Sequence, residues 1–104
     1  MTLEQLARAG RAPALPLRIE LPGGELEVLS LLRVLPGQRY VGEARWQGRR
    51  VLAKLLVGER ASRQFARERE GCRLLAAAAA PTPALLDSGE AGGQGAWLLF
   101  DFIE

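Results

Sequence analysis

The chain has 104 residues, of which 48% are hydrophobic and 25% are charged, enough for one small domain with a single modest core. Its net charge of +2 is too weak to indicate a nucleic acid or an anionic membrane by itself. The absence of histidine excludes His-based acid–base chemistry and His metal sites, and no apolar run reaches the roughly 20 residues of a membrane-spanning helix.

Residues 1–28 predict a short helix followed by a β-hairpin. Thr2 and Gln5 fit a capping box, with Thr2 as the N-cap of the helix. Residues 17–21 alternate apolar and polar side chains, as a half-exposed strand does, and residues 25–32 supply an antiparallel return strand after a Pro-Gly-Gly turn. We expect residues 1–28 to form an extension, with the hairpin packed on the outside of the domain.

Residues 29–57 predict an antiparallel meander of three strands, whose first turn holds Pro and Gly37. In the third strand, residues 49–57, six of the last seven residues are apolar and Lys54 interrupts them. Lys54 is the only lysine of the chain, against 13 arginines, and it shares a strand face with Leu52 and Leu56. A charge at such a position is costly to bury without a partner, so we expect an acidic group opposite it.

A helix is predicted from about residue 60 to residue 80, where Pro81 ends it. One stripe of this helix should form core against the sheet, and its members are Phe65, Glu68, Cys72, Leu75 and Ala79. Glu68 therefore faces the sheet, whereas Glu70 lies about 200° further round the helix. The spacing selects Glu68 as the partner of Lys54, and a distance of about 2.7–3.2 Å between their charged atoms would indicate an assembled site.

The last part of the chain predicts two further strands. Residues 84–86 form a short strand, residues 87–95 a Gly-rich loop, and residues 96–103 a final strand with Asp101 as its polar interruption. The sequence stops at Glu104 without a cap, turn or polar tail. We therefore expect a fragment of a longer protein.

Three pieces of the chain carry a resemblance through their order and spacing. They are Val51-Leu52-Ala53-Lys54, then Arg67-Glu68 with Leu74-Leu75 and Pro81-Thr82-Pro83, and then Trp97 to Glu104. Residues 29–104 thereby resemble the N-terminal lobe of bacterial lipopolysaccharide (Kdo or heptose) kinase-like proteins, within the protein-kinase-like superfamily. The resemblance implies an α+β fold, with an antiparallel five-stranded sheet, one long packed helix and a missing C-terminal lobe.

The resemblance also implies a nucleotide site. Lys54 would contact the α- and β-phosphates of ATP, and the Glu68 carboxylate would hold the lysine in place. The groups implied around the adenine are Leu35, Val41 and Leu52 above the ring, Phe100 as gatekeeper, and the backbone of Asp101 and Ile103 as the hinge.

Two departures from the family pattern affect the site. The expected phosphate-covering turn contains a proline and only Gly37, where the family has G-x-G-x-x-G, so it offers fewer backbone amides. Arg39 is a candidate to supply charge instead. The catalytic Asp and Asn and the Mg²⁺-binding Asp of the family have no counterpart in the chain and are expected beyond Glu104. The 104 residues alone should therefore not catalyse phosphoryl transfer.

The hypothesis we favour is the nucleotide-binding lobe of an ATP-dependent phosphotransferase acting on a sugar or protein hydroxyl. The alternative is a non-catalytic pseudokinase-type interaction module that self-associates through an exposed C-terminal strand. The arginines of the helix predict a face in contact with solvent, and we expect no nucleic-acid partner. Two further interpretations stay open: a small domain that binds nucleic acid through its arginines, and association with the inner-membrane surface. Lys54 could also extend to solvent from an edge strand, with Glu68 paired to arginines of its own helix.

The expected location is the cytoplasm. The single Cys72 cannot form an internal disulfide, which fits a reducing compartment, and the N-terminus lacks the basic-then-apolar layout of a signal peptide.

Overall fold

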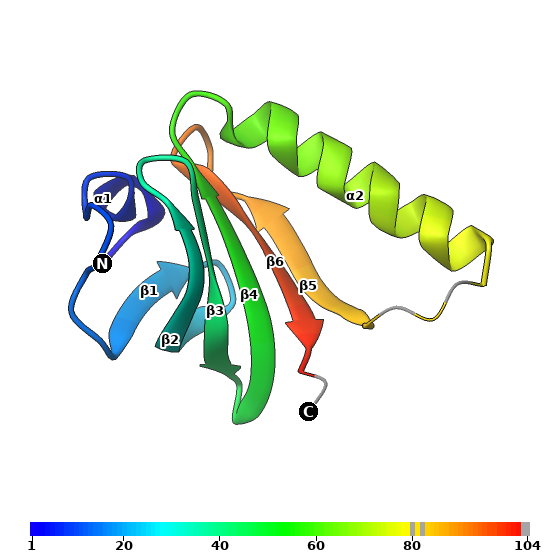
Figure 1. Cartoon of the computed structure of the whole chain (residues 1–104), viewed down its shortest axis with the longest axis horizontal. Helices are drawn as coiled ribbons and strands as arrows, with labels where there is room; N and C mark the ends of the chain where they lie inside the picture. The colour runs from blue at the N-terminus through cyan, green and yellow to red at the C-terminus, as the bar shows by residue number, and fades with distance from the viewer. Residues whose placement is uncertain (80, 82, 103–104) are drawn as a thin grey trace.

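A computed structural model describes residues 1–79, 81 and 83–102 of the chain. Within this part, one antiparallel sheet has the strand order β1-β2-β3-β4-β6-β5, and a long helix lies along one of its faces (Figure 1). The elements in chain order are α1 (Leu3–Leu6), β1 (Leu17–Leu21), β2 (Gly24–Leu35), β3 (Arg39–Trp46), β4 (Arg49–Val57), α2 (Ala61–Ala77), β5 (Leu85–Glu90) and β6 (Gly95–Asp101).

The α+β class, with an antiparallel sheet and one long helix, is confirmed, but the expected number of five strands is wrong. The sheet has six strands within the described residues, because β1 of the hairpin joins the five expected strands. It joins them because the return strand of the hairpin and the first strand of the meander are one continuous β2. The pairing of β2 with β3 shifts register between Val28 and Ser30 and again between Leu31 and Arg33. Such irregularities bend a strand, so β2 can belong to both the hairpin and the meander.

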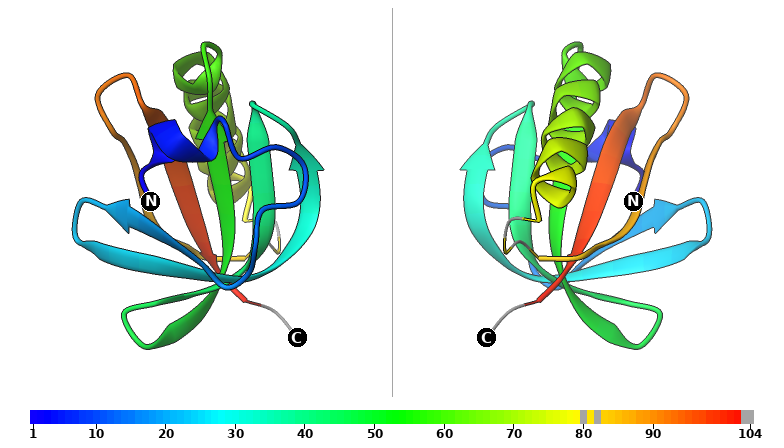
Figure 2. Two further views of the ribbon diagram at one scale, coloured as in Figure 1. Left: turned by 90° about the vertical axis from the view of Figure 1, so that its left-hand side faces the viewer. Right: turned by 90° about the vertical axis from the view of Figure 1, so that its right-hand side faces the viewer.

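The sequence analysis predicted that the hairpin packs on the outside of the domain, and this prediction is wrong. Leu17, Ile19 and Leu26 are buried in the main core together with residues from β3, β4 and β6. The alternation of β1 was recognised correctly, but its apolar side chains point into the same core as the rest of the sheet. A sheet that curls, as this one does, brings its first strand over the face of its later strands (Figure 2).

The helices α1 and α2 lie on opposite sides of the strands (Figure 2). The side that carries α1 holds the larger core. Its buried residues are Leu3, Leu6, Leu17, Ile19, Leu21, Leu26, Val28, Tyr40, Ala44, Trp46, Val51, Ala53, Leu55, Val57, Trp97 and Leu99. We call this side the α1 face of the sheet.

The other side, which we call the α2 face, holds a smaller core. Its buried residues are Leu56, Ala61, Phe65, Ala96, Leu98 and Phe100. Helix α2 is anchored there by the first half of its length, through Ala61 and Phe65. Its second half packs less closely, and Leu74 and Leu75 are exposed.

The N-terminal residues close one edge of the sheet. The predicted capping box is confirmed, because Thr2 Oγ1 accepts a hydrogen bond from the Gln5 amide and Gln5 Oε1 accepts one from the Thr2 amide. The N-terminal ammonium donates to the carbonyl of Arg18, and the amide of Glu20 donates to the carbonyl of Met1. These bonds occupy backbone groups of β1 that would otherwise form an open sheet edge.

The last two strands of the sheet correct two predictions. Strand β6 pairs with β4 on one side and with β5 on the other, so the edge strand is β5 and not the C-terminal strand. Strand β5 extends to Glu90, so residues 87–90 of the expected loop are in fact paired. Gly89 makes this pairing fit, because a Cβ there would lie 2.5 Å from the ring of Trp97. Among the described residues, no helix combines the length and apolar character needed to cross a membrane.

Candidate functional site

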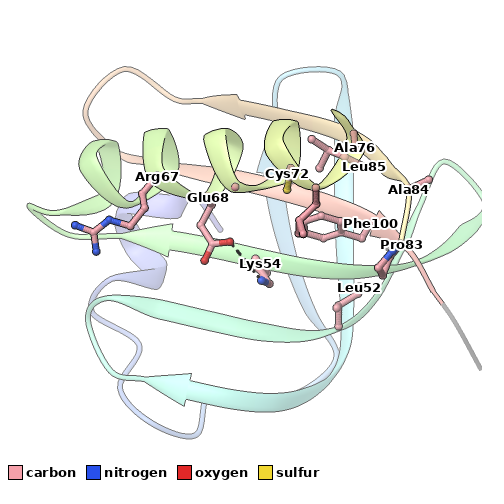
Figure 3. A pocket seen from close by; sticks show the side chains of 12 residues that line it. Leu52, Lys54, Arg67, Glu68, Cys72, Ala76, Pro83, Ala84, Leu85 and Phe100 are labelled. Carbon is pink, nitrogen blue, oxygen red and sulfur yellow. Dashed lines mark hydrogen bonds and ion pairs between the residues drawn. The ribbon is translucent and has the colours of Figure 1, made fainter. Parts of the chain in front are cut away.

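Lys54 and Glu68 meet on the α2 face, as the helix spacing predicted. Lys54 Nζ lies 3.4 Å from Glu68 Oε2, and the two side chains retain 28% and 23% of their accessible surface. The distance is slightly beyond the 2.7–3.2 Å that we set for an assembled site, but it is within ion-pair range. In Figure 3 the two side chains point toward each other. The alternative in which Lys54 extends from an edge strand is excluded, because β4 is an inner strand.

The alternation of β4 explains why Lys54 points to α2. Ala53 and Leu55 are buried in the core on the α1 face, so the residue between them must emerge on the opposite side. There, Lys54 Nζ lies 5.5 Å from the centre of the Phe100 ring, within the range of a cation–π interaction. A lysine at this position is therefore held by a carboxylate from α2 and an aromatic ring from β6.

A second cation shares the Glu68 carboxylate. The Arg39 guanidinium lies 3.4 Å from Glu68 Oε1, and 29% of the arginine side chain is exposed. Val41 is the register partner of Lys54, and Arg39 is two residues before Val41 on the same strand, so both cations emerge on the α2 face. One carboxylate of α2 thus bridges a cation of β3 and a cation of β4.

Glu70 has a different environment, on the solvent side of α2. It pairs with Arg73 at 2.6 Å. The hydrogen bond from Arg73 lowers the pKa of Glu70 and raises the pKa of Arg73. The choice of Glu68 over Glu70 as the inward-facing acid is therefore confirmed.

A groove of about 570 Å³ adjoins the Lys54–Glu68 pair, between α2 and the sheet. It is lined by Leu52, Lys54, Arg67, Glu68, Gly71, Cys72, Leu75, Ala76, Pro83, Ala84, Leu85 and Phe100. The charged groups lie at one end, whereas the rest of the lining is mostly apolar (Figure 3). The guanidinium of Arg67 points away from Lys54 in this view.

Some of the predicted nucleotide-binding residues come together at this groove. Leu52 and Phe100 line it beside Lys54 and Glu68. Val41 emerges on the same face, opposite Lys54 in register, but is outside the lining.

Other predicted residues lie elsewhere. Leu35 is 50% exposed, and neither it nor Gly37 lines the groove. The amide of Asp101 donates to the carbonyl of Ala84, and its carboxylate lies 3.6 Å from Arg49. Ile103 is outside the described residues, so its predicted hinge role stays a prediction.

The sequence analysis did not predict the end of the groove that lies away from Lys54 and Glu68. Leu75 was expected in the core, but it is 46% exposed and lines the groove with Ala76, Pro83 and Leu85. The signal was present in the run of alanines that begins at residue 76, because methyl groups are too small to fill the space between a helix and a sheet.

The described residues contain no group of three or more Cys, Asp or Glu side chains that could hold a metal ion. Comparisons with protein-family models, with curated proteins and with solved structures found no match.

Proposed function

We propose that this chain is the nucleotide-binding lobe of an ATP-dependent phosphotransferase that acts on a hydroxyl of a sugar, such as a lipopolysaccharide core sugar, or of a protein. The observation that carries the proposal is the Lys54–Glu68 pair at one end of a mostly apolar groove. In this proposal, residues 29–104 form a kinase-like lobe, to which β1 and α1 add a further strand and a cap.

The chemistry of the pair suits the phosphates of a nucleotide. The Lys54 ammonium can offset phosphate charge, while the Glu68 carboxylate keeps it protonated and oriented. The groove has the volume of a small-molecule site, and Leu52 and Phe100 supply the apolar surface that an adenine ring requires. Mg²⁺ would neutralise the β- and γ-phosphate oxygens when bound. The present residues would bind and orient the nucleotide.

Titration calorimetry with ATP tests the proposal. We expect Lys54→Met to lower the affinity for ATP at least about tenfold, since it removes charge-assisted hydrogen bonds to phosphate. Arg63→Gln is the matched control, because it removes one positive charge from an exposed position on α2. Adenosine, which lacks phosphate, should bind both variants as it binds the parent protein. Equal ATP affinity in Lys54→Met and Arg63→Gln, or no binding of ATP to the parent protein at millimolar concentration, would overturn the proposal.

The alternative function, a non-catalytic interaction module, has one observation in its favour. Strand β5 ends the sheet and carries the exposed Leu85, which lines the groove together with the exposed Leu75 of α2. Edge strands beside apolar surface recruit other chains. Self-association in sedimentation velocity that is lost in Leu75→Glu, together with no binding of ATP, would favour this alternative.

A further inference from the structure

We infer that the site recognises a linear polyphosphate through two side-chain cations, Arg39 and Lys54, and not through backbone amides of the β2–β3 turn. The ligand class is a chain of at least two phosphates, either the tail of a nucleoside triphosphate or inorganic tripolyphosphate. For a nucleotide ligand the inference rests on the proposed function.

The β2–β3 turn has little to offer an anion. Pro36 has no amide hydrogen, and the amide of Gln38 already donates to the carbonyl of Leu35 at 2.9 Å. The Gln38 carbonyl accepts from the amide of Val57, and the Gly37 carbonyl lies so near Gly58 that a Cβ there would be 2.5 Å from it. Neither Pro36 nor Gln38 therefore offers an amide to an anion, and the turn is held against the junction of β4 and α2.

The cluster of Arg39, Lys54 and Glu68 carries an excess of one positive charge. Arg39 and Lys54 each lie 3.4 Å from an oxygen of the same carboxylate, so Glu68 balances only one of them. Glu43, the next acid of β3 on this face, lies 2.6 Å from Arg50 and is already paired. An arginine has five N–H donors and a lysine three, so the contact with Glu68 leaves donors of both available for a ligand.

The placement of the two cations favours a chain of phosphates over a single one. They emerge from neighbouring strands on one face, and Glu68 lies between them. Successive phosphates could therefore each meet a different cation. The planar guanidinium of Arg39 suits paired phosphate oxygens, and the Lys54 ammonium suits a point contact. Both side chains keep less than a third of their surface exposed, which limits screening by salt.

Calorimetric titration with inorganic tripolyphosphate, ATP and adenosine tests the inference on the whole chain. We expect Arg39→Gln to weaken both polyphosphate ligands about tenfold or more and to leave adenosine unchanged. Arg63→Gln, which removes the same charge from an exposed position, should change the affinity less than about twofold. Arg39→Lys keeps the charge but loses the planar fork, so its affinity should lie between those of the parent and Arg39→Gln. It also serves if Arg39→Gln fails to fold.

The outcomes separate this inference from the proposed function. Binding of tripolyphosphate that depends on Arg39, without binding of ATP, supports the inference and overturns the proposed function. Binding of ATP with the same affinity in Arg39→Gln and Arg63→Gln overturns the inference and leaves the proposed function intact. Failure of both ligands to bind the parent protein overturns both.

Discussion

The two faces of the sheet are packed differently, although the same strands supply both. On the α1 face, apolar side chains from the sheet and from α1 form a closed core. On the α2 face, the first half of the helix packs closely, and the second half leaves a groove with the Lys54–Glu68 pair at one end. Strand β4 divides its residues between the two, because successive side chains point in opposite directions.

This difference indicates which face contributes more to the stability of the fold. A closed apolar core gains free energy from nearly every side chain in it, whereas a groove leaves apolar surface in contact with water. Within the described residues, no charged side chain is buried, and Arg39, Lys54 and Glu68 are only partly exposed on the α2 face. The α1 face should therefore supply most of the free energy of folding.

The largest expected effect is in the α1-face core. Leu55→Ala should lower the free energy of unfolding by about 2–5 kcal/mol, because Leu55 is fully enclosed and its removal leaves a cavity. Leu75→Ala, the matched variant in the groove, should cost less than about 1 kcal/mol, since nearly half of that side chain is already in water. Urea denaturation of both variants measures the difference. Equal losses would show that the groove is packed as tightly as the core.

An intermediate effect is expected at Gly58, in the connection between β4 and α2. Gly58 and Gly48 have similar positive φ angles, 81° and 76°, but only at Gly58 would a Cβ meet another atom, the carbonyl oxygen of Gly37. Gly48→Ala should cost about 1 kcal/mol from the backbone conformation alone. Gly58→Ala should cost at least about 2 kcal/mol, because the turn must also move. The same denaturation experiment compares them, and equal costs would mean that the turn moves without penalty.

The smallest effect is expected at the Glu70–Arg73 pair, on the solvent side of α2. The hydrogen bond from Arg73 holds the pKa of Glu70 below its ordinary value of 4.5. A lowered pKa of an acid stabilises the folded state above the unfolded pKa, and this contribution is lost as the pH falls through the folded pKa. We expect Arg73→Gln to be slightly less stable than the parent at pH 7 and equally stable in acid below the folded pKa. Thermal unfolding measured across this range tests it, and a difference that persists in acid would assign the effect to something other than the ion pair.

Much of the local structure could be predicted from the sequence. The capping box at Thr2, the strand around Lys54 and the helix from about residue 60 follow from local pattern, and the structure has all three. The strand count could not be predicted in the same way. Nothing local distinguishes a strand that ends near residue 32 from one that continues to Leu35 through two shifts of register. The turn around Gly37 was expected to cover the phosphates of a nucleotide, but Gly37 does not line the groove. Its position relative to the groove depends on how the whole sheet and α2 pack.

The sequence by itself determined that Lys54 and Glu68 would emerge on faces that could meet, because strand and helix periodicities are fixed by backbone geometry. Only the tertiary structure decided that Arg39 joins them, that β6 lies inside the sheet, and that the alanine-rich end of α2 leaves a groove open. These features depend on contacts between residues far apart in the chain. Such contacts are set by which surfaces can be buried together, and no local pattern encodes that choice.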